Sequence, residues 1–217
     1  MAHWYLKDLT RQFNVYPLTT CVWDPDLQPH LQPQGKAAPM AHTPLAESLR
    51  AIRALQKYRP YLATRLGKGQ TEADPRTYIR WVSDDVGWGL FAEQAIPAGA
   101  PVGIYVGIRT NKTEDTDYAW KYNPRGPVFD PQGRTILVFV DSLYAGNELR
   151  FVNHGDGPRY DDQGGLLNTP IANARSMHVP WKGHWEIVYE AIQDIAVHEQ
   201  ILVDYGPAYW SSRAEAL

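Results

Sequence analysis

The chain has 217 residues, of which 44% are hydrophobic and 21% charged, and its formal net charge at pH 7 is −3. This length suits one domain with a full core plus an extension, and no apolar run approaches the roughly 18 residues that cross a bilayer. A basic stripe for a phosphate backbone and an N-terminal secretory pattern are both absent, so we expect a soluble intracellular protein without direct nucleic-acid or membrane binding.

Residues 1–42 are rich in Pro, Gln, His and Trp, and their prolines interrupt any periodic pattern. An extended arm or irregular cap is expected there. A helix of about four turns is predicted next, because Thr43 suits a cap and Pro44 a first helical turn. Apolar residues then recur at helical spacing until Pro60, namely Leu45, Leu49, Ile52 and Leu55. Core packing, substrate positioning and partner binding all remain open for this amphipathic helix.

The chain becomes β-rich after residue 75. Short strands are predicted at 77–82, 101–106, 135–140, 184–189 and 200–205, with turns at 83–89 and 98–100. Because no long helices alternate with them, small packed sheets are favoured over a nucleotide-binding parallel sheet. The expected organisation is an N-terminal arm with its helix at 1–75, then a domain at 76–217 with an inserted loop near 156–171.

Four short motifs carry the functional information: GWGLFA at 87–92, YVG at 105–107, RFVNHG at 150–155 and EQILVDYG at 199–206. The glycines of the first motif permit positive φ and close backbone approach to a ligand. Together and in this order, the motifs resemble the SET-domain family of protein lysine methyltransferases, over about residues 76–210. Cysteine-rich zinc modules are common in that family and absent here, which resembles its minimal viral and bacterial members.

The resemblance implies a mainly β fold of the SET type (β-clip), with small sheets around a knot-like core and an N-terminal helical extension. It implies S-adenosyl-L-methionine as the methyl donor and a protein lysine as the acceptor. The residues that it assigns to the donor are Gly87, Trp88, Gly89, Asn153, His154 and Trp210. The residues that it assigns to catalysis are Tyr205 and Tyr105, and those that it assigns to the lysine channel are Tyr105, Tyr118 and Tyr205.

The sequence departs from the family pattern at two positions. Gly155 follows the Asn-His pair where the family commonly has serine, and the Pro-Asn step expected soon afterwards is represented only by 173–175. We interpret the polar stretch between them as an inserted surface loop. Tyr209 and Trp210 after the last motif fit either an aromatic lid or a packing plug.

The implied reaction suits these residue types. Methyl transfer to an amine is an in-line displacement that depends on alignment, and an aromatic channel lowers the pKa of a lysine by desolvating it. Aromatic faces tolerate the cationic methylated product. No metal is needed, and the single cysteine, Cys21, excludes a cysteine-built zinc cluster. A metal site at His178, His184 and His198 matches no ligand spacing.

The expected substrate is a protein or peptide bearing lysine, with a histone tail as one candidate. Acidic clusters at 84–85, 114–117 and 156–162 favour a basic peptide or are simply solvated turns. A homodimer remains open, and the nucleus, a host cell or the cytoplasm are the compartments considered. Two alternatives to the enzyme are a catalytically inactive SET-like module that binds peptide or cofactor and a scaffold that uses the N-terminal helix.

Overall fold

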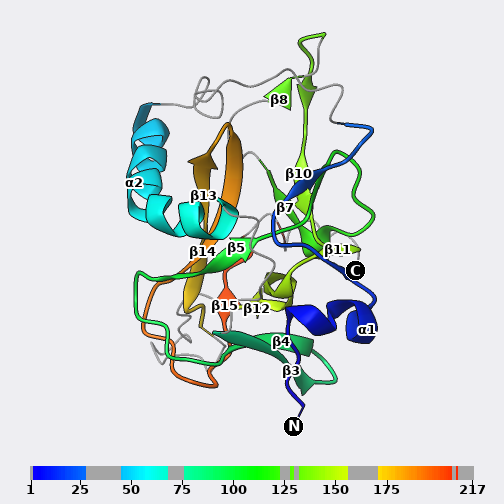
Figure 1. Cartoon of the computed structure of the whole chain (residues 1–217), viewed down its shortest axis with the longest axis vertical. Helices are drawn as coiled ribbons and strands as arrows, with labels where there is room; N and C mark the ends of the chain where they lie inside the picture. The colour runs from blue at the N-terminus through cyan, green and yellow to red at the C-terminus, as the bar shows by residue number, and fades with distance from the viewer. Residues whose placement is uncertain are drawn as a thin grey trace, which may run out of the picture.

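The computed structural model describes residues 2–27, 45–67, 76–122, 128–129, 132–155, 171–206 and 209. Within this part of the chain, short strands form several small sheets and two α-helices accompany them (Figure 1). This arrangement confirms the mainly β fold expected from the sequence. No helix in the described ranges is both long and apolar enough to cross a membrane.

The largest sheet consists of β12 (Asn153–His154), β15 (Leu202–Val203), β13 (Ala174–Trp181), β14 (His184–Ala191) and β5 (Pro101–Tyr105), in that spatial order. Its centre is the antiparallel hairpin of β13 and β14. Lys182 and Gly183 close the hairpin with φ values of 46° and 86°, and two consecutive positive φ values are what a tight primed turn requires. Strands were predicted at β5, β14 and β15 but not at β13, which carries a proline and several polar residues.

The second sheet consists of β2 (Val22–Trp23), β6 (Ile108–Thr110), β10 (Phe139–Asp141) and β7 (Ala119–Lys121), in that spatial order. Three strand pairs complete the β-structure: β3 (Thr77–Ser83) with β4 (Gly87–Ala92), β8 (Val128–Phe129) with β9 (Thr135–Ile136), and β1 (Tyr16–Pro17) with β11 (Ala145–Gly146). The strand predicted at 135–140 is divided between β9 and β10. Short 3-10 helices are η1 (Leu6–Asp8), η4 (Thr116–Tyr118) and η5 (Glu148–Phe151).

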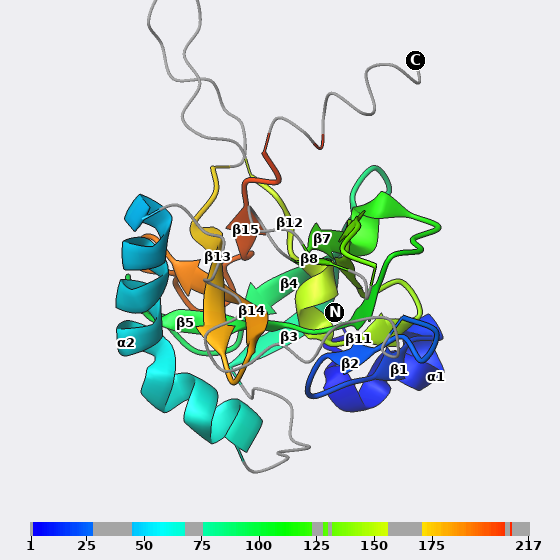
Figure 2. The ribbon, with the colours of Figure 1, turned by 90° about the horizontal axis from the view of Figure 1, so that it is seen from above.

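The N-terminal segment 2–27 caps the domain instead of extending from it. Trp4 and Ile79 exchange two backbone hydrogen bonds, of 3.0 and 2.7 Å. Helix α1 (Leu9–Phe13) follows η1, and β1 and β2 then pair in parallel with β11 and β6. Figure 1 and Figure 2 place α1 on the side of the molecule opposite to the long helix α2 (Leu45–Gly67). The predicted division at residue 75 lies in a range, 68–75, that the structure does not describe.

Helix α2 continues past the point where the sequence predicted its end. It runs from Leu45 to Gly67 with Pro60 inside it, so the predicted end at Pro60 is wrong. Proline removes one backbone donor and bends a helix, and Figure 2 shows α2 bending along its length. The expected capping residues Thr43 and Pro44 lie outside the described residues.

The buried face of α2 also differs from the predicted stripe. Leu49 and Ile52 are 48% and 37% exposed. Ala51, Tyr58 and Leu62 are buried instead, and the helix lies against β13. The core-packing interpretation is therefore confirmed for α2, but through a stripe that continues into the turn beyond Pro60. A buried carboxylate, Glu190 of β14, also accepts a hydrogen bond from the Lys57 ammonium and anchors the helix.

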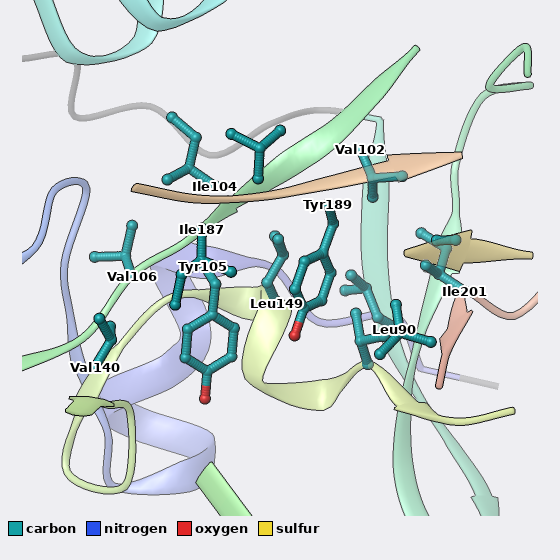
Figure 3. Packing of buried hydrophobic residues seen from close by; sticks show 14 of the residues in the cluster. Leu90, Val102, Ile104, Tyr105, Val106, Val140, Leu149, Ile187, Tyr189 and Ile201 are labelled. Atoms are coloured by element: carbon teal, nitrogen blue, oxygen red, sulfur yellow. The ribbon is translucent and has the colours of Figure 1, made fainter. Parts of the chain in front are cut away.

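The core lies between the large sheet and η5. Figure 3 shows Leu149 of η5 packed among aliphatic side chains of the sheet, with the rings of Tyr105 and Tyr189 beside it and both hydroxyl groups on the same side. The two rings are stacked, with centroids 5.9 Å apart. A Cβ at Gly103 would lie 2.7 Å from Leu149, so β5 passes η5 too closely for any larger residue there. This packing directs the tyrosine hydroxyls out of the core.

Candidate active site

An aromatic cavity of about 410 Å³ lies where those tyrosine hydroxyls emerge. Aromatic side chains from several segments line it, among them Tyr105 at the end of β5, Trp120 in β7, Tyr189 in β14 and Tyr205 just after β15. Trp120 lies edge-on to the other three rings, at 6.4 Å from Tyr105, 6.0 Å from Tyr189 and 6.4 Å from Tyr205. Edge-to-face packing at these separations is favourable, so the walls support one another.

Tyr205 is held at both ends. Its backbone N–H donates to His154 Nδ1 at 3.2 Å, and its hydroxyl donates to the Val152 carbonyl at 2.6 Å. Burial raises the pKa of Tyr205 well above its ordinary value, and Tyr209 and Tyr105 raise it further. The phenol is therefore neutral at physiological pH and does not act as a base. Because its one proton is donated to Val152, its oxygen offers the cavity acceptor capacity only.

Tyr105 repeats this arrangement on the facing wall. Its hydroxyl donates to the Tyr118 carbonyl at 2.5 Å, and burial raises its pKa far above the usual value. Burial also raises the pKa of the neighbouring Tyr189. Both predicted catalytic tyrosines thus lie in one cavity as neutral hydrogen-bond acceptors, and an amine, which has only donors when protonated, complements them.

The third predicted channel residue, Tyr118, contributes its backbone instead of its ring. Tyr118 ends η4, and its ring lies under the Arg150 guanidinium, 4.0 Å from the guanidinium carbon. It is not among the residues that line the cavity, whereas Trp120 two positions later is. Sequence reasoning missed Trp120 and Tyr189. The signal for Trp120 was an aromatic residue two positions from Tyr118, but the side of β7 that it occupies depends on the pairing with β10.

The predicted donor loop lies at the start of β4. Gly87 has φ +76°, and nothing lies within 4 Å of a Cβ built there. At Gly89 a Cβ would meet Gln200 Nε2 at 2.5 Å and Val82 Cγ2 at 2.8 Å. The positive φ favours glycine at position 87, and a larger residue at position 89 would displace the side chains of Gln200 and Val82. A Cβ at Gly87 would face open space.

Asn153 connects this loop with the third motif. Its side-chain Nδ2 donates to the Trp88 carbonyl at 3.0 Å. The Trp88 ring packs edge-on against Phe13 at 5.1 Å and Trp81 at 5.2 Å, so α1 of the N-terminal cap supports the loop from behind. The structure thus brings together predicted donor residues that are about 65 positions apart in the sequence.

His154 joins the donor region to the cavity, because β12 runs parallel to β15 and ends beside Tyr205. The two rings have centroids 5.4 Å apart. The predicted donor residue Trp210 lies outside the described residues. Tyr209 lines the cavity, with its ring 4.7 Å from that of Tyr205 and its hydroxyl donating to Asp117 at 3.2 Å.

The two departures from the family pattern have structural explanations. A Cβ at Gly155 would lie 2.7 Å from Ala172 N and 2.8 Å from Leu202 Cβ, so no serine fits there. Asn173 stands where the sequence has its counterpart of the family's Pro-Asn step. Its side-chain amide donates to the Gln200 carbonyl at 2.8 Å and accepts from the Leu202 N–H at 2.9 Å. Residues 156–170 of the expected insertion lie outside the described ranges.

Four polar groups border the aromatic walls: Asp117, Lys121, Arg150 and His178. Burial lowers the pKa of His178, whose Nε2 lies 2.8 Å from the Lys121 carbonyl, so this imidazole is neutral near pH 7 and donates through Nε2. In the described ranges, no three His, Cys, Asp or Glu side chains gather as a metal site would require. The arrangement is a neutral aromatic cavity with a few charges at its edge.

Comparison with known proteins assigns the matching region to one family. The family profile described as "SET domain" matches residues 87–206, which includes all four motifs. Among curated proteins, the chain is 27% identical over 135 residues to the histone-lysine N-methyltransferase set-17 of Caenorhabditis elegans, covering 61% of this chain and 41% of that protein. It is 28% identical over 150 residues to the histone-lysine N-methyltransferase EZH2 of Chaetomium thermophilum, covering 65% and 8%. The chain therefore spans less than half the length of either relative.

A solved structure extends the likeness over the fold. The crystal structure of ATXR5 in complex with mono-methylated histone H3.1 matches with a TM-score of 0.59 at 13% sequence identity, covering 94% of this chain and 86% of that one. At this identity the match supports a shared architecture. This structural match covers more of the chain than the family profile, which matches residues 87–206.

Proposed function

Because this chain belongs to the SET-domain family, we propose that it is a methyltransferase that uses S-adenosyl-L-methionine and acts on protein lysine side chains. One observation carries the proposal. The hydroxyls of Tyr105 and Tyr205 line one aromatic cavity, and each has already donated its proton to a backbone carbonyl. The cavity therefore accepts hydrogen bonds and attracts cations, which fits the ammonium or amine of lysine.

We infer the cofactor, S-adenosyl-L-methionine, from the family, and two features of the predicted donor region support its placement there. Gly87 leaves open space beside a backbone with positive φ, and Asn153 fixes the adjoining Trp88 carbonyl. Gly87, Trp88, Gly89, Asn153 and His154 would hold the donor. When bound, this cofactor supplies an electrophilic methyl group on a sulfonium. His154 lies between this donor region and the aromatic cavity, because its ring contacts Tyr205.

The chain's own contribution is alignment and control of protonation. Tyr205, fixed through both its N–H and its hydroxyl, holds the acceptor nitrogen in place, and near-attack alignment supplies most of the acceleration in displacements of this kind. The raised pKa values of Tyr105 and Tyr205 exclude phenolates as bases. The lysine proton therefore leaves to an acceptor other than these two phenols, such as water at the cavity mouth, helped by the desolvation that lowers the pKa of a buried amine.

The proposed substrate is a lysine-bearing segment of another protein, with histone tails as the first candidates. The two curated relatives are named as histone-lysine methyltransferases, and the matched crystal structure contains histone H3.1. On this chain, Asp117 lines the cavity and is exposed. A carboxylate at that position favours a basic peptide through its charge.

The test is methyl transfer to lysine peptides, followed by mass spectrometry, with purified protein and isotopically labelled cofactor. We expect lysine methylation by the wild-type chain and a loss of roughly 10²-fold in kcat for Tyr205→Phe, because a positioned polar group that acts on the reacting centre contributes on this order. Tyr16→Phe is the matched control, since Tyr16 is 67% exposed and lies outside the cavity. Calorimetric binding of the cofactor without any transfer would support an inactive binding module instead, and absence of both would support the scaffold alternative.

A further inference from the structure

One strong charge borders the aromatic cavity from within the protein, and it belongs to Arg150. Its guanidinium lies 4.0 Å from the Tyr118 ring centre and 4.9 Å from that of Phe151. Its Nε donates to Ser142 O at 2.9 Å and one terminal nitrogen donates to Leu143 O at 3.2 Å. These partners are aromatic faces and neutral carbonyls, so they orient the cation without cancelling its charge.

The charge of Arg150 is only weakly neutralised by the described part of the chain. No carboxylate there lies within 4 Å of it, whereas Arg109 and Arg175 each contact one. Asp141 is the acidic neighbour that acts on Arg150 at longer range, and burial raises the pKa of that carboxyl. A partly buried charge without a close counter-ion projects its field into the adjoining cavity more strongly than an exposed one.

The aromatic walls create a problem that a cation at this position would solve. Tyrosine and tryptophan faces stabilise a protonated amine, and a protonated lysine has no lone pair with which to attack a methyl group. Desolvation of the amine disfavours its protonated form and so opposes this stabilisation. A fixed positive charge near the amine adds to desolvation, because bringing two like charges together disfavours the ammonium form.

We propose that Arg150 acts electrostatically on the target lysine, lowering the pKa of the bound amine so that the neutral nucleophile is populated in an otherwise cation-binding cavity. This inference rests on the proposed function. Arg150 lines the cavity, and an amine bound about 6 to 8 Å from its charge would, at an effective dielectric constant of about 20, have its pKa lowered by roughly one and a half to two units. The population of neutral lysine near pH 7.5 then rises by at least about tenfold.

Other titratable groups face the same cavity and enter the pH dependence. They are the phenols Tyr105, Tyr189, Tyr205 and Tyr209, the carboxylate Asp117, the ammonium Lys121 and the imidazole His178. The first three phenols stay neutral because burial raises their pKa values, and burial keeps His178 neutral by lowering its pKa. Asp117 and Lys121 are exposed and opposite in charge. Among the charged side chains that line the cavity, Arg150 is therefore expected to have the strongest effect on a bound amine.

The first experiment is the pH profile of kcat for the wild-type protein and for Arg150→Gln and Arg150→Lys. In the wild type, kcat rises with pH to a plateau as the bound amine loses its proton. Arg150→Gln is expected to move the midpoint of that rise upward by about one pH unit and to lower kcat about tenfold on the acidic limb. Arg150→Lys keeps the charge and is expected to keep the midpoint, even where its altered hydrogen bonds lower the plateau.

A structural role for Arg150 predicts a different pattern. If the guanidinium only braces Tyr118, both variants lower kcat by a constant factor at every pH and the midpoint stays in place. Equal midpoints in the wild type and Arg150→Gln therefore overturn the electrostatic role. Lys112→Gln is the charge-matched control, because Lys112 is an exposed cation paired with Asp26 outside the cavity. Its midpoint is expected to equal that of the wild type.

The second experiment needs no turnover. A peptide whose monomethyl-lysine carries a ¹³C-methyl label is titrated by NMR, free and bound to the wild-type protein. The proposal predicts a bound amine pKa below the free value, and a bound value at or above the free one overturns it even if Arg150→Gln does not fold. Because desolvation also lowers this pKa, the share due to Arg150 is the upward shift of the bound value in Arg150→Gln, with Arg150→Lys as the charge-conserving comparison. A wild-type chain that methylates lysine while this pKa is not lowered refutes the role of Arg150 alone. A chain that neither binds nor methylates any lysine peptide refutes the proposed function as well.

Discussion

The buried ion pair between Arg109 and Glu186 gives the sharpest prediction about stability. Arg109 of β6 and Glu186 of β14 are 3% and 4% exposed, and their charged atoms lie 2.7 Å apart. Trp23 from the N-terminal cap lies 5.5 Å from the guanidinium carbon. The pair therefore joins the two larger sheets beneath the cap, in a region that water does not reach.

Removal of one member of this ion pair leaves the other charge buried without a counter-ion. Arg109→Met leaves Glu186 buried without a cation, and loss of one member of a buried pair costs about 3 to 5 kcal/mol of the free energy of unfolding. For a domain of this size, that corresponds to a fall in Tm of roughly 10 °C. The remaining Glu186 oxygen has no hydrogen-bond partner among the described residues even in the intact pair, so no second group there offsets the loss of the arginine.

The pH dependence of this variant follows from the direction of the Glu186 pKa. Burial already raises it, and the Arg109 guanidinium opposes the rise, so the pKa rises further when the arginine is removed. A carboxyl whose folded pKa is raised contributes stability below its unfolded pKa of about 4.5 that is lost as the pH increases through the folded pKa. The destabilisation of Arg109→Met is therefore expected to be smaller at pH 5 than at pH 8.

Urea denaturation followed by tryptophan fluorescence measures both effects. The control is Lys112→Met, which breaks an ion pair whose side chains are 70% and 79% exposed and is expected to cost less than about 1 kcal/mol. A loss below about 1 kcal/mol for Arg109→Met at pH 8, or an equal loss at pH 5 and pH 8, would refute the reasoning.

Three further predictions concern packing and reactivity. Leu62→Ala is expected to lower the free energy of unfolding by about 2 to 5 kcal/mol, because Leu62 is buried. Leu49→Ala is expected to lower it by less than about 0.5 kcal/mol, because Leu49 is 48% exposed. Equal losses in urea denaturation would contradict the assigned buried face of α2. Gly155→Ala is expected to destabilise by about 1 to 3 kcal/mol, since its Cβ meets the Ala172 backbone at 2.7 Å; an unchanged Tm would contradict that contact. Burial raises the pKa of Cys21 to about 11, so iodoacetamide at pH 8 is expected to alkylate the native thiol at least about 100-fold more slowly than the urea-unfolded one, and equal rates would show that the cap does not cover it.

The sequence was most informative at the four motifs, where the family resemblance assigned roles to residues whose local structure could also be predicted. Tyr105 and Tyr205 end apolar segments that the two-residue period identifies as strands, and both line the cavity. Gly87 and Gly89 were predictable because turn geometry and close approach both select glycine. At Gly89, however, the neighbouring atoms belong to Val82, Asn153 and Gln200, which lie outside its own motif.

The sequence was least informative where the outcome depends on a partner far along the chain. Trp120 and Tyr189 line the cavity because β7 pairs with β10 and β14 with β5, and these registers decide which face each side chain occupies. Helix α2 passes Pro60 because Tyr58 and Leu62 are buried on both sides of it, and burial of that size outweighs the local cost of one proline.

The N-terminal segment illustrates the same limit. Its strands are two residues long and pair in parallel with β6 and β11, and such short parallel pairings leave no periodic signal. The prolines and polar residues suggested an extended arm or an irregular cap, and in residues 2–27 tertiary contacts fix the cap. Trp88 packs against Phe13 of that cap, which connects a segment of unassigned role to the predicted donor loop.

The most direct test of the central claim is a crystal structure of the chain with a demethylated cofactor product and a lysine peptide. We expect the lysine nitrogen to enter between Tyr105, Trp120 and Tyr205 and to stop within about 4 Å of the Tyr205 hydroxyl. The product sulfur is expected on the side of Gly87 and Asn153, as near-attack alignment requires. A lysine bound outside the aromatic cavity, or a cofactor product bound away from both Gly87 and Asn153, would contradict it.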